Sequence, residues 1–356
     1  MSRTVKGLFV EGPEDKFKRK EFERRALSPK DVDIDIVGAG ICSSDLHQVR
    51  GEWGDSCYDG PGMCPGHEIT GIVRAVGPEV TKFKVGDRVG IGCMVDSCRE
   101  CEACKGGDEQ LCDTGFVGTY NAKYKYEHHP EVGNSTFGGY STGIVCNEDF
   151  VLRIPDNLDL VKAAPLLCAG ATCFSPLHYY GFEKGQTLGV AGLGGLGHMA
   201  VKFGIAMGAK VVILSRGLAK KEDAFKLGAH EYIDVKDPEA LRKGAKSIDM
   251  IIDTISAKHD LSEYLNLTKA NGKLILLGLP GKELPVDPVS LVMTRRTLGG
   301  SIIASVKETQ IMLDFCSEHN ILPDVELVTA DEVDEAYERV HNADVRYRCV
   351  IKVDTI

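Results

Sequence analysis

The feature that most restricts the fold of this chain is a glycine-rich turn, Gly192-Leu193-Gly194-Gly195-Leu196-Gly197, which separates an apolar stretch from a helix-forming stretch. A G-x-G-x-x-G in this setting is typical of a dinucleotide-binding βαβ unit. The glycines let the backbone approach a pyrophosphate, and the helix N-terminus supplies free N–H groups and a partial positive charge. Some glycine-rich turns only reverse the chain, but the flanking strand and helix here favour a nucleotide site.

Alternating elements around this turn predict a parallel sheet. From about residue 160, short apolar runs alternate with helical patterns. We expect six strands, at Thr187–Ala191, Lys210–Leu214, Tyr232–Val235, Ile248–Asp253, Lys273–Gly278 and Leu298–Ile303. Strands joined by crossover helices are typical of a doubly wound Rossmann domain, so the fold class is α/β.

The chain before this region predicts a domain of another kind. Short apolar or alternating segments, interrupted by glycine, proline and aspartate, indicate a β-rich structure. They are Val32–Val37, Gly71–Val76, Arg88–Ile91 and Ser141–Val145. A last strand, Arg348–Val353, is expected to return to this first domain. We therefore expect a catalytic domain at 1–158, a nucleotide domain at 159–304 and a C-terminal segment at 305–356 that rejoins the catalytic domain.

The end of the second expected Rossmann strand bears on the choice of cofactor. NAD-preferring domains usually carry Asp or Glu there to bind the ribose hydroxyls. This chain has Ser215-Arg216, with Lys220 shortly after. A hydroxyl, a guanidinium and an ammonium would bind a 2′-phosphate that a carboxylate would repel. These residues favour NADP(H), and a merely solvated basic helix start is the alternative.

Four cysteines in one loop predict a metal site. Cys98, Cys101, Cys104 and Cys112 form C-x2-C-x2-C-x7-C. Four thiolates this close together can complete a tetrahedral shell around Zn²⁺ and leave no position open for chemistry, as in structural zinc sites. An iron–sulfur cluster is the alternative ligand of such a loop.

Three further residues, Cys42, His67 and Cys168, have the composition of a catalytic zinc site. Two thiolates and one imidazole leave a fourth position for water or substrate. Their wide separation in the sequence does not itself join them, because a lone cysteine is more often a small buried apolar residue.

The overall composition excludes some partners and favours a reducing compartment. The chain has 356 residues and a formal net charge of −10, which argues against a general affinity for nucleic acid or anionic membranes. It has no apparent export signal or membrane span. Its 13 cysteines are therefore more readily explained as thiolate ligands in the cytoplasm than as disulfides.

Motifs along nearly the whole chain resemble one enzyme family. They are G-I-C-S-S-D-L-H-Q-V-R-G-E-W, P-G-H-E, V-G-D-R-V-G, D-S-C-R-E-C-E-A-C, A-P-L-L-C-A-G-A-T, G-L-G-G-L-G-H-M and A-Y-E-R-V. In order and content they resemble the zinc-containing medium-chain dehydrogenase/reductases, most of all the cinnamyl alcohol dehydrogenase-like branch with its NADPH-dependent aldehyde reductases. The resemblance implies a GroES-like catalytic domain joined to a Rossmann domain.

The resemblance also implies roles at the metal. Cys42, His67 and Cys168 match the ligands of the catalytic zinc, and Glu68 matches a carboxylate that approaches the metal during ligand exchange. Asp45 matches the residue that orients the ligating imidazole. Ser44 and His47 match the proton relay.

Further positions are implied for the cofactor and substrate. Thr172, Ser301 and Ile303 match residues near the nicotinamide, with the last two expected on the sixth Rossmann strand, and Thr254 and Gly278 are also expected at the cofactor. Trp53 and Ile302 are candidates for an apolar substrate pocket, although Trp53 is equally explained by packing. Where close plant relatives show a run of serines, Arg216 replaces hydroxyl contacts with a charge.

The implied activity is hydride transfer between NADP(H) and a primary alcohol/aldehyde pair, in the direction of aldehyde reduction, with zinc polarising the carbonyl. Medium-sized hydrophobic or aromatic aldehydes are the expected substrates. The alternatives are a reductase of an imine or conjugated double bond, an NAD-dependent polyol dehydrogenase, and a nicotinamide-binding protein without turnover. By resemblance, pairing of the Leu298–Ile303 edge strands predicts a homodimer.

Overall fold

The computed structural model describes residues 2–54 and 56–356, which divide into two compact units. Unit 1 comprises 1–171 and 304–356, and unit 2 comprises 172–303. Residues 159–171, expected from the sequence in the nucleotide domain, group with unit 1 because the short helix η3 (Ala164–Leu167) packs against strands of that unit. Within the described residues, no helix has the length and apolar character needed to cross a membrane.

Unit 1 contains one large sheet, antiparallel except at the pairing of its two most C-terminal strands, and two separate two-stranded sheets. Its strands are β1 (Arg3–Phe9), β2 (Lys18–Arg24), β3 (Asp31–Ile41), β4 (Ile69–Val76), β5 (Arg88–Ile91), β6 (Met94–Asp96), β7 (Val117–Gly118), β8 (Gly143–Asn147), β9 (Leu152–Arg153), β16 (Val325–Val328) and β17 (Arg348–Lys352). The main sheet has the order β16-β17-β3-β4-β5-β9, and β8 also pairs with β3. The last strand, β17, pairs antiparallel with β3.

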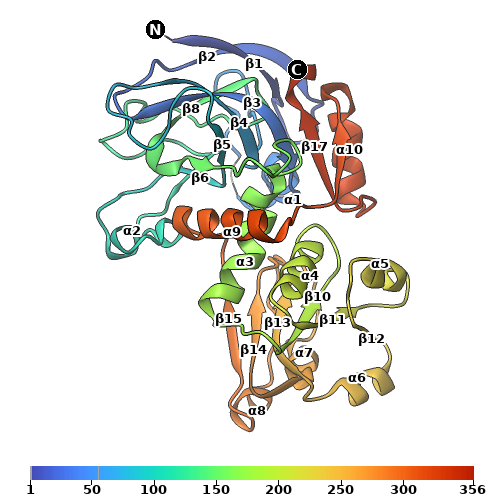
Figure 1. The fold of residues 1–356 in the computed structure, drawn as a ribbon. Helices are drawn as coiled ribbons and strands as arrows, with labels where there is room; N and C mark the ends of the chain where they lie inside the picture. Colours follow the sequence, from blue (N-terminus) through green and yellow to red (C-terminus); the bar gives the residue numbers. More distant parts are fainter. Residues whose placement is uncertain (1, 55) are drawn as a thin grey trace. The chain divides into compact units, whose positions relative to one another are not determined.

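The helices of unit 1 lie around this sheet. They are α1 (Ser43–Val49), α2 (Glu102–Gly106), α9 (Val306–His319) and α10 (Val333–His341), with the short turns η1 (Glu109–Leu111), η2 (Glu148–Phe150), η4 (Ala330–Glu332) and η5 (Val353–Thr355). Figure 1 shows α10 beside β17. Strand β3 runs through the centre of the sheet, and its residues Val32, Ile34 and Ile41 are almost inaccessible to solvent. It ends directly before Cys42, a residue of the candidate site.

Unit 2 contains the predicted six-stranded parallel sheet, in the order β12-β11-β10-β13-β14-β15. Its elements after α3 (Ala169–Tyr179), a helix that begins in unit 1, are β10 (Thr187–Ala191), α4 (Gly197–Ala206), β11 (Lys210–Ser215), α5 (Lys221–Lys226), β12 (Glu231–Asp234), α6 (Pro238–Gly244), β13 (Ile248–Asp253), α7 (Leu261–Leu267), β14 (Thr268–Leu276), α8 (Pro288–Val292) and β15 (Thr297–Gly300). All neighbouring strands are parallel.

The order of these strands places the ligand edge of unit 2. β10 lies between β11 and β13 (Figure 1). After β10 the chain first forms β11 and β12 on one side of it, and then forms β13, β14 and β15 on the other side. Ligands of doubly wound sheets bind at the carboxyl ends of the strands where the order reverses in this way. The glycine turn follows β10 at this point. The expected sixth strand is confirmed as an edge, although β15 ends at Gly300 rather than at Ile303.

Candidate functional site

Four potential metal ligands converge in unit 1 from distant parts of the sequence. Cys42 follows β3, His67 and Glu68 immediately precede β4, and Cys168 follows η3. One ligand atom from each lies within 4.8 Å of all the others, and all four residues are buried. Pairing of β3 with β4 places Cys42 beside His67 and Glu68, because Ala39 and Ile69 are partners in that ladder. We call this group the dispersed centre.

A glycine makes room for the carboxylate of this centre. A Cβ atom at Gly40 would lie 1.9 Å from Oε2 of Glu68. Gly66, which directly precedes His67, has a φ of +105°, a backbone conformation that a residue with a side chain rarely adopts. The glycines of the motifs that begin G-I-C-S-S-D and P-G-H-E are therefore needed for the backbone of the centre, while the same motifs also supply its ligands.

Asp45 orients two of the ligands. As the third residue of α1 it accepts a hydrogen bond at Oδ2 from the Cys42 N–H (2.9 Å), as in a capping box. Its Oδ1 lies 3.1 Å from Nδ1 of His67, which leaves Nε2 as the ring atom available to a metal. Burial lowers the pKa of His67, but the nearby Asp45 carboxylate helps to raise it well above its usual value.

Three tyrosines complete these surroundings, and none was predicted. The Tyr140 hydroxyl donates to Asp45 Oδ2 (3.1 Å), and the Tyr337 hydroxyl lies 3.3 Å from that of Tyr140. The Tyr120 ring stacks on His67 with 5.8 Å between centroids. Tyr140, Tyr337 and Tyr120 lie far from Asp45 in the sequence, so no spacing links them to it.

Glu68 forms a buried ion pair that the sequence did not reveal. Its Oε1 accepts a hydrogen bond from Nη2 of Arg348, the first residue of β17. Its Oε2 is buried and has no hydrogen-bond partner among the described residues. Burial raises the pKa of Glu68 to about 7, although Arg348 opposes this rise. In the sequence, Arg348 could have been noticed as a charged residue at the start of an otherwise apolar strand.

The two thiols of the dispersed centre lie 3.9 Å apart and affect each other's protonation. The hydrogen bond from Cys168 lowers the pKa of Cys42 well below its usual value, and the same contact raises that of Cys168. One thiolate is therefore favoured before any cation binds, and a divalent cation would stabilise the second.

The donors of the dispersed centre fit zinc. Two sulfurs and one imidazole nitrogen are ligands that Zn²⁺ prefers, and three such ligands leave a position for exchange. The buried Glu68 Oε2, without a partner among residues 2–54 and 56–356, is a further donor that a cation would satisfy.

The expected proton-relay residues lie next to this centre on α1. Ser44 Oγ is 3.6 Å from the Cys42 sulfur. His47 is one turn further on, where its Nδ1 lies 2.5 Å from Oε2 of Glu52 and its ring stacks on Trp53 at 4.7 Å. Trp53 is 46% exposed. A hydroxyl at the metal ligands and a partly exposed imidazole further along are thus carried by one short helix.

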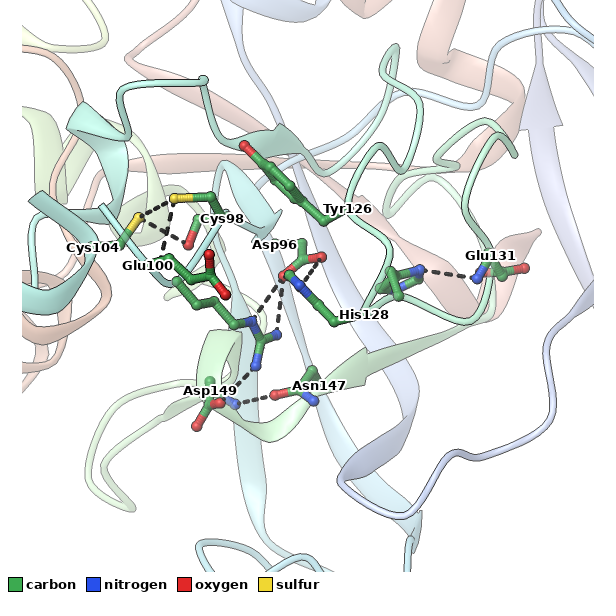
Figure 2. Close-up of polar contacts among 12 residues, drawn as sticks. Asp96, Cys98, Glu100, Cys104, Tyr126, His128, Glu131, Asn147 and Asp149 are labelled. Atoms are coloured by element: carbon green, nitrogen blue, oxygen red, sulfur yellow. Dashed lines mark hydrogen bonds and ion pairs between the residues drawn. The ribbon is translucent and has the colours of Figure 1, made fainter. Parts of the chain in front are cut away.

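The other four cysteines form the second centre, the four-cysteine loop. The sulfurs of Cys98, Cys101, Cys104 and Cys112 also lie within 4.8 Å of one another, and those of Cys98 and Cys104 are 3.8 Å apart (Figure 2). Backbone N–H groups point at two of the sulfurs: Cys101 donates to Cys98 (3.3 Å) and Cys104 donates to Cys101 (3.5 Å). Four sulfurs with local N–H donors fit a closed tetrahedral zinc shell.

Side chains around the loop favour at least one thiolate. Burial alone would raise the pKa of Cys112, but hydrogen bonds from Thr114, the Cys98 backbone and the Tyr126 hydroxyl lower it to about 5. Burial raises the pKa of Cys104 to about 12. None of the 13 cysteines, all of which lie in the described part of the chain, forms a disulfide that would compete for these sulfurs.

An ionic network fastens the four-cysteine loop to the rest of unit 1. Asp96, wholly buried at the end of β6, accepts hydrogen bonds from Nε and Nη2 of Arg99 and lies 3.0 Å from Nε2 of His128 (Figure 2). Nη1 of Arg99 donates to Asp149 (3.0 Å), and its guanidinium lies over Phe150. Arg99 stands between two of the cysteines, so these contacts hold the backbone of the loop.

The glycine turn of unit 2 has the form of a phosphate cradle. Gly192 has a φ of +87°, and a Cβ at Gly197 would lie 2.0 Å from the Gly192 carbonyl oxygen. Apart from Gly194 and its chain neighbours, no heavy atom of the described residues lies within 4 Å of the Cβ position at Gly194. The turn, with Leu193, Gly195 and Leu196 between its glycines, leads into the N-terminus of α4. This compact, open backbone fits the diphosphate of a dinucleotide.

The residues expected to select the cofactor lie at the end of β11. Arg216 is exposed there, and Ser215 is half-buried. Lys220 Nζ donates to the Leu193 carbonyl oxygen (2.7 Å), which places this cation against the glycine turn. Asp234, which was not predicted, fixes the connection by accepting a hydrogen bond from the Gly217 N–H (2.8 Å).

The other expected cofactor residues fall into two groups. Thr254 and Gly278 lie at the glycine turn, because Thr254 Oγ1 donates to the Ala191 carbonyl (2.9 Å) and a Cβ at Gly278 would meet the carbonyl of the residue after Thr254. Thr172 is buried at the start of unit 2.

The expected strand position of Ser301 and Ile303 is wrong. Both follow the end of β15, since Ile303 has a φ of +38°, which an extended strand does not permit. Ser301 still donates its N–H to Leu276 (3.1 Å). Ile302, a candidate for the substrate pocket, is 48% exposed.

Comparisons with known proteins identify the family of this chain. Residues 28–156 match the family model "Alcohol dehydrogenase GroES-like domain", and residues 195–318 match "Zinc-binding dehydrogenase". The NADP-dependent alcohol dehydrogenase C 1 of Mycolicibacterium smegmatis is 54% identical over 329 residues, which cover 92% of each chain.

Two solved structures are similar over nearly the whole chain. A cinnamyl alcohol dehydrogenase of Sorghum bicolor has a TM-score of 0.93 at 41% identity, covering 99% of this chain and 98% of that one. The cinnamyl alcohol dehydrogenase of Helicobacter pylori complexed with NADP(H) has a TM-score of 0.90 at 41% identity, covering 99% of both. With its two matched domains and its two cysteine centres, the chain belongs to the zinc-containing medium-chain dehydrogenase/reductases, in the cinnamyl alcohol dehydrogenase-like branch.

Proposed function

We propose that this chain is a zinc-dependent, NADP(H)-linked alcohol dehydrogenase that favours aldehyde reduction. The observation that carries the proposal is the dispersed centre, where two thiols, an imidazole and an exchangeable carboxylate meet beside the Ser44 hydroxyl. A four-cysteine loop alone would support only a structural metal, and a glycine turn alone only nucleotide binding. Relatives named for alcohol dehydrogenation support the same activity.

When bound, zinc supplies Lewis-acid polarisation of the carbonyl and NADPH supplies the hydride. The residues of the chain prepare and complete this chemistry. Asp45 holds the Cys42 backbone and the His67 ring in position for the metal. In the proposed relay, Ser44, whose Oγ lies near the Cys42 sulfur, gives a proton to the product oxygen, and the partly exposed His47 replaces that proton from water.

The preference for NADP(H) is proposed from the charges after β11. Arg216 is exposed at the position where an NAD-preferring domain carries a carboxylate, and Lys220 lies against the glycine turn. The M. smegmatis relative is named as NADP-dependent, and the H. pylori relative was solved with NADP(H). Both agree with the charge argument.

For substrates, we propose medium-sized hydrophobic or aromatic aldehydes. The two apolar side chains expected at the substrate pocket, Trp53 and Ile302, are about half exposed and available to an apolar ligand. The S. bicolor relative is named for cinnamyl alcohol. A hydroxyl and an imidazole on α1 favour carbonyl chemistry, which needs a proton at oxygen, over reduction of an imine or a conjugated double bond.

The direct test is NADPH oxidation against a panel of aliphatic and aromatic aldehydes, an imine, a conjugated enone and a polyol. We expect turnover with the aldehydes and none with NADH and the polyol. Turnover confined to the enone or the imine would replace the proposed reaction. A parallel variant, Arg216→Asp, should weaken NADPH binding by at least about 100-fold while affecting NADH much less. Equal losses for the two cofactors would overturn the NADP assignment.

A cytoplasmic homodimer is proposed as the working state. β15 is an unpaired sheet edge within the described residues. Just before it, α8 and its C-cap residue expose three apolar side chains, Val289 (61%), Val292 (76%) and Met293 (75%). Pairing of two such edges would cover both features. Free thiols at both metal centres suit a reducing compartment. Gel filtration with light scattering should give twice the chain mass, and a monomer at micromolar concentration would contradict the dimer.

A further inference from the structure

A histidine outside the predicted site lies at the carboxyl edge of the unit 2 sheet. His259 ends the loop 254–259 that follows β13 and immediately precedes Asp260, the N-cap of α7. Its Nε2 lies 2.7 Å from Oδ2 of Asp253, the last residue of β13, and its Nδ1 lies 2.8 Å from the Ala257 carbonyl oxygen. The side chain of His259 is 10% exposed and that of Asp253 is 1% exposed.

These two contacts define the protonation state of the ring. A backbone carbonyl can only accept a hydrogen bond, and so can an ionised carboxylate. Both ring nitrogens of His259 therefore act as donors, which requires the imidazolium form. A neutral ring would lose one of these bonds and leave an acceptor unpaired in a nearly buried position, which is unfavourable.

The loop that His259 closes packs on the glycine turn. Thr254 Oγ1 donates to the carbonyl of Ala191 (2.9 Å) and lies 3.2 Å from that of Gly192. The Ile255 N–H donates to Asp253 Oδ1 (3.0 Å), so one carboxylate holds both the first part and the end of the loop. A Cβ at Gly192 would lie 2.9 Å from Thr254 Oγ1. A change in this loop would therefore reach the first glycine of the turn.

The groups that face His259 come from three other elements. They are Asp253 on β13, Tyr264 on α7, whose ring meets that of His259 edge-on at 5.2 Å, and Arg216 after β11. Burial and Arg216 lower the pKa of His259, but the hydrogen bonds to Asp253 and Ala257 prevail and raise it above its usual value. The raised pKa agrees with the imidazolium that the geometry requires.

We infer that His259 is a positioning residue for the dinucleotide: its imidazolium joins Asp253 to the Ala257 carbonyl and so holds loop 254–259 against the glycine turn. This inference rests on the proposed nicotinamide cofactor. The ring and Asp253 form a neutral pair, so the effect is on the shape of the turn rather than on attraction of the 2′-phosphate. Loss of the proton as the pH rises through the raised pKa should weaken cofactor binding.

The test is the dissociation constant of NADPH and of NADH, followed by cofactor fluorescence from about pH 6 to about pH 9. We expect the wild type to bind both cofactors more weakly as the pH rises. His259→Gln keeps a single donor and no charge, so it should bind both about ten-fold more weakly at the acidic end and show little further pH dependence. His230→Gln is the matched control, because His230 contacts the amino end of β11 through the Val211 N–H.

The outcomes separate this inference from the proposed function. If the wild type binds neither cofactor at any pH, the proposed function fails. If it binds NADPH and His259→Gln binds it equally well with the same pH profile, the inference fails and the function stands. A loss for NADPH without a loss for NADH would also overturn the inference, because it would give His259 an electrostatic role at the 2′-phosphate. The wild-type pH profile provides a test that does not depend on folding of the variant.

Discussion

The two cysteine centres of unit 1 are constructed in opposite ways. The four-cysteine loop takes its donors from fifteen consecutive residues, 98–112, and three of its four cysteines are partly exposed. The dispersed centre takes its donors from three separate places in the chain, and all of them are buried. Local N–H groups surround the sulfurs of the loop, whereas Asp45, Arg348 and buried tyrosines surround the dispersed centre.

This difference suggests that the two centres have different roles. The loop offers four sulfurs, which complete a tetrahedral shell and leave no place for substrate. The dispersed centre offers two sulfurs and one nitrogen, and its fourth donor, Glu68, is already engaged by Arg348. A carboxylate with an alternative partner can leave a metal without becoming an unpaired buried charge. The loop therefore suits stability, and the dispersed centre suits exchange and catalysis.

The largest expected effect comes from removing a ligand of the dispersed centre. Cys168→Ala should lower kcat/KM for aldehyde reduction by at least about 1,000-fold, since carbonyl polarisation is lost, while NADPH affinity stays within about two-fold. Steady-state kinetics, fluorescence titration and zinc analysis measure these quantities. Cys146→Ala, a buried cysteine on β8, is the matched control. Substantial turnover by a metal-free Cys168→Ala protein would refute the assignment.

Removing a ligand of the four-cysteine loop should act on stability instead. Cys101→Ser should lower the free energy of unfolding by about 3 kcal/mol or more, because zinc no longer ties the loop together. Thermal denaturation and zinc content measure this effect. The protein that remains folded should keep an unchanged kcat when turnover is expressed per zinc ion bound at the dispersed centre. An unchanged Tm after loss of the loop zinc would contradict a stabilising role.

A smaller effect is expected from Asp45→Asn. Asp45 orients His67 and increases its basicity, so the variant should bind zinc at the dispersed centre about 10- to 100-fold more weakly and leave the loop zinc in place. Competition with a chromogenic chelator measures both sites. Equal weakening of the two sites would show that the change acts on the whole fold rather than on one ligand.

The contact between Asp45 and His67 also predicts how zinc binding at the dispersed centre depends on pH. Because the pKa of His67 is raised, protons compete with zinc for this imidazole at higher pH than for an ordinary histidine. Zinc affinity at the dispersed centre should therefore rise with pH until the pH exceeds that pKa, and acidification should release the metal. In Asp45→Asn, proton competition should begin at lower pH. The same pH profile in both proteins would contradict this role of Asp45.

The smallest effect is expected at the loop anchor. Arg99→Gln removes the contacts to Asp96 and Asp149 at a partly exposed position, which should cost about 1 kcal/mol and speed zinc release from the loop a few-fold. Stopped-flow chelation measures the rate. Lys105→Gln, on the exposed side of α2, is the control. Loss of activity greater than loss of loop zinc would show that the two centres are not independent.

Much of the fold followed from local patterns in the sequence. The six parallel strands, the glycine turn and the four-cysteine loop each depend on residues close together in the chain. The boundaries of β5, β10 and β13 match the predicted ranges. The end of β15 did not, because hydrophobicity continues through Ile302 and Ile303 after the backbone has left the sheet.

The dispersed centre depended on resemblance, and the fold explains why. Cys42 and His67 meet because β3 and β4 pair. Arg348 reaches Glu68, which is 280 residues earlier in the chain, because β17 pairs with β3. Tyr140 and Asp45 likewise meet only in the folded chain. Spacing in the sequence contains no information about such contacts. The ligands could be predicted because they matched a family motif, whereas Arg348 and Tyr140, which contact Glu68 and Asp45, were missed.

The central claim, zinc-dependent reduction of aldehydes by NADPH, is tested most directly by following zinc and turnover together during stepwise chelation and zinc return. We predict two zinc ions per chain, one for each cluster of ligands. Activity should fall in proportion to zinc lost from the dispersed centre and recover when zinc is restored, with NADPH binding unchanged throughout. Full aldehyde reduction by a folded protein with an empty dispersed centre would contradict the account.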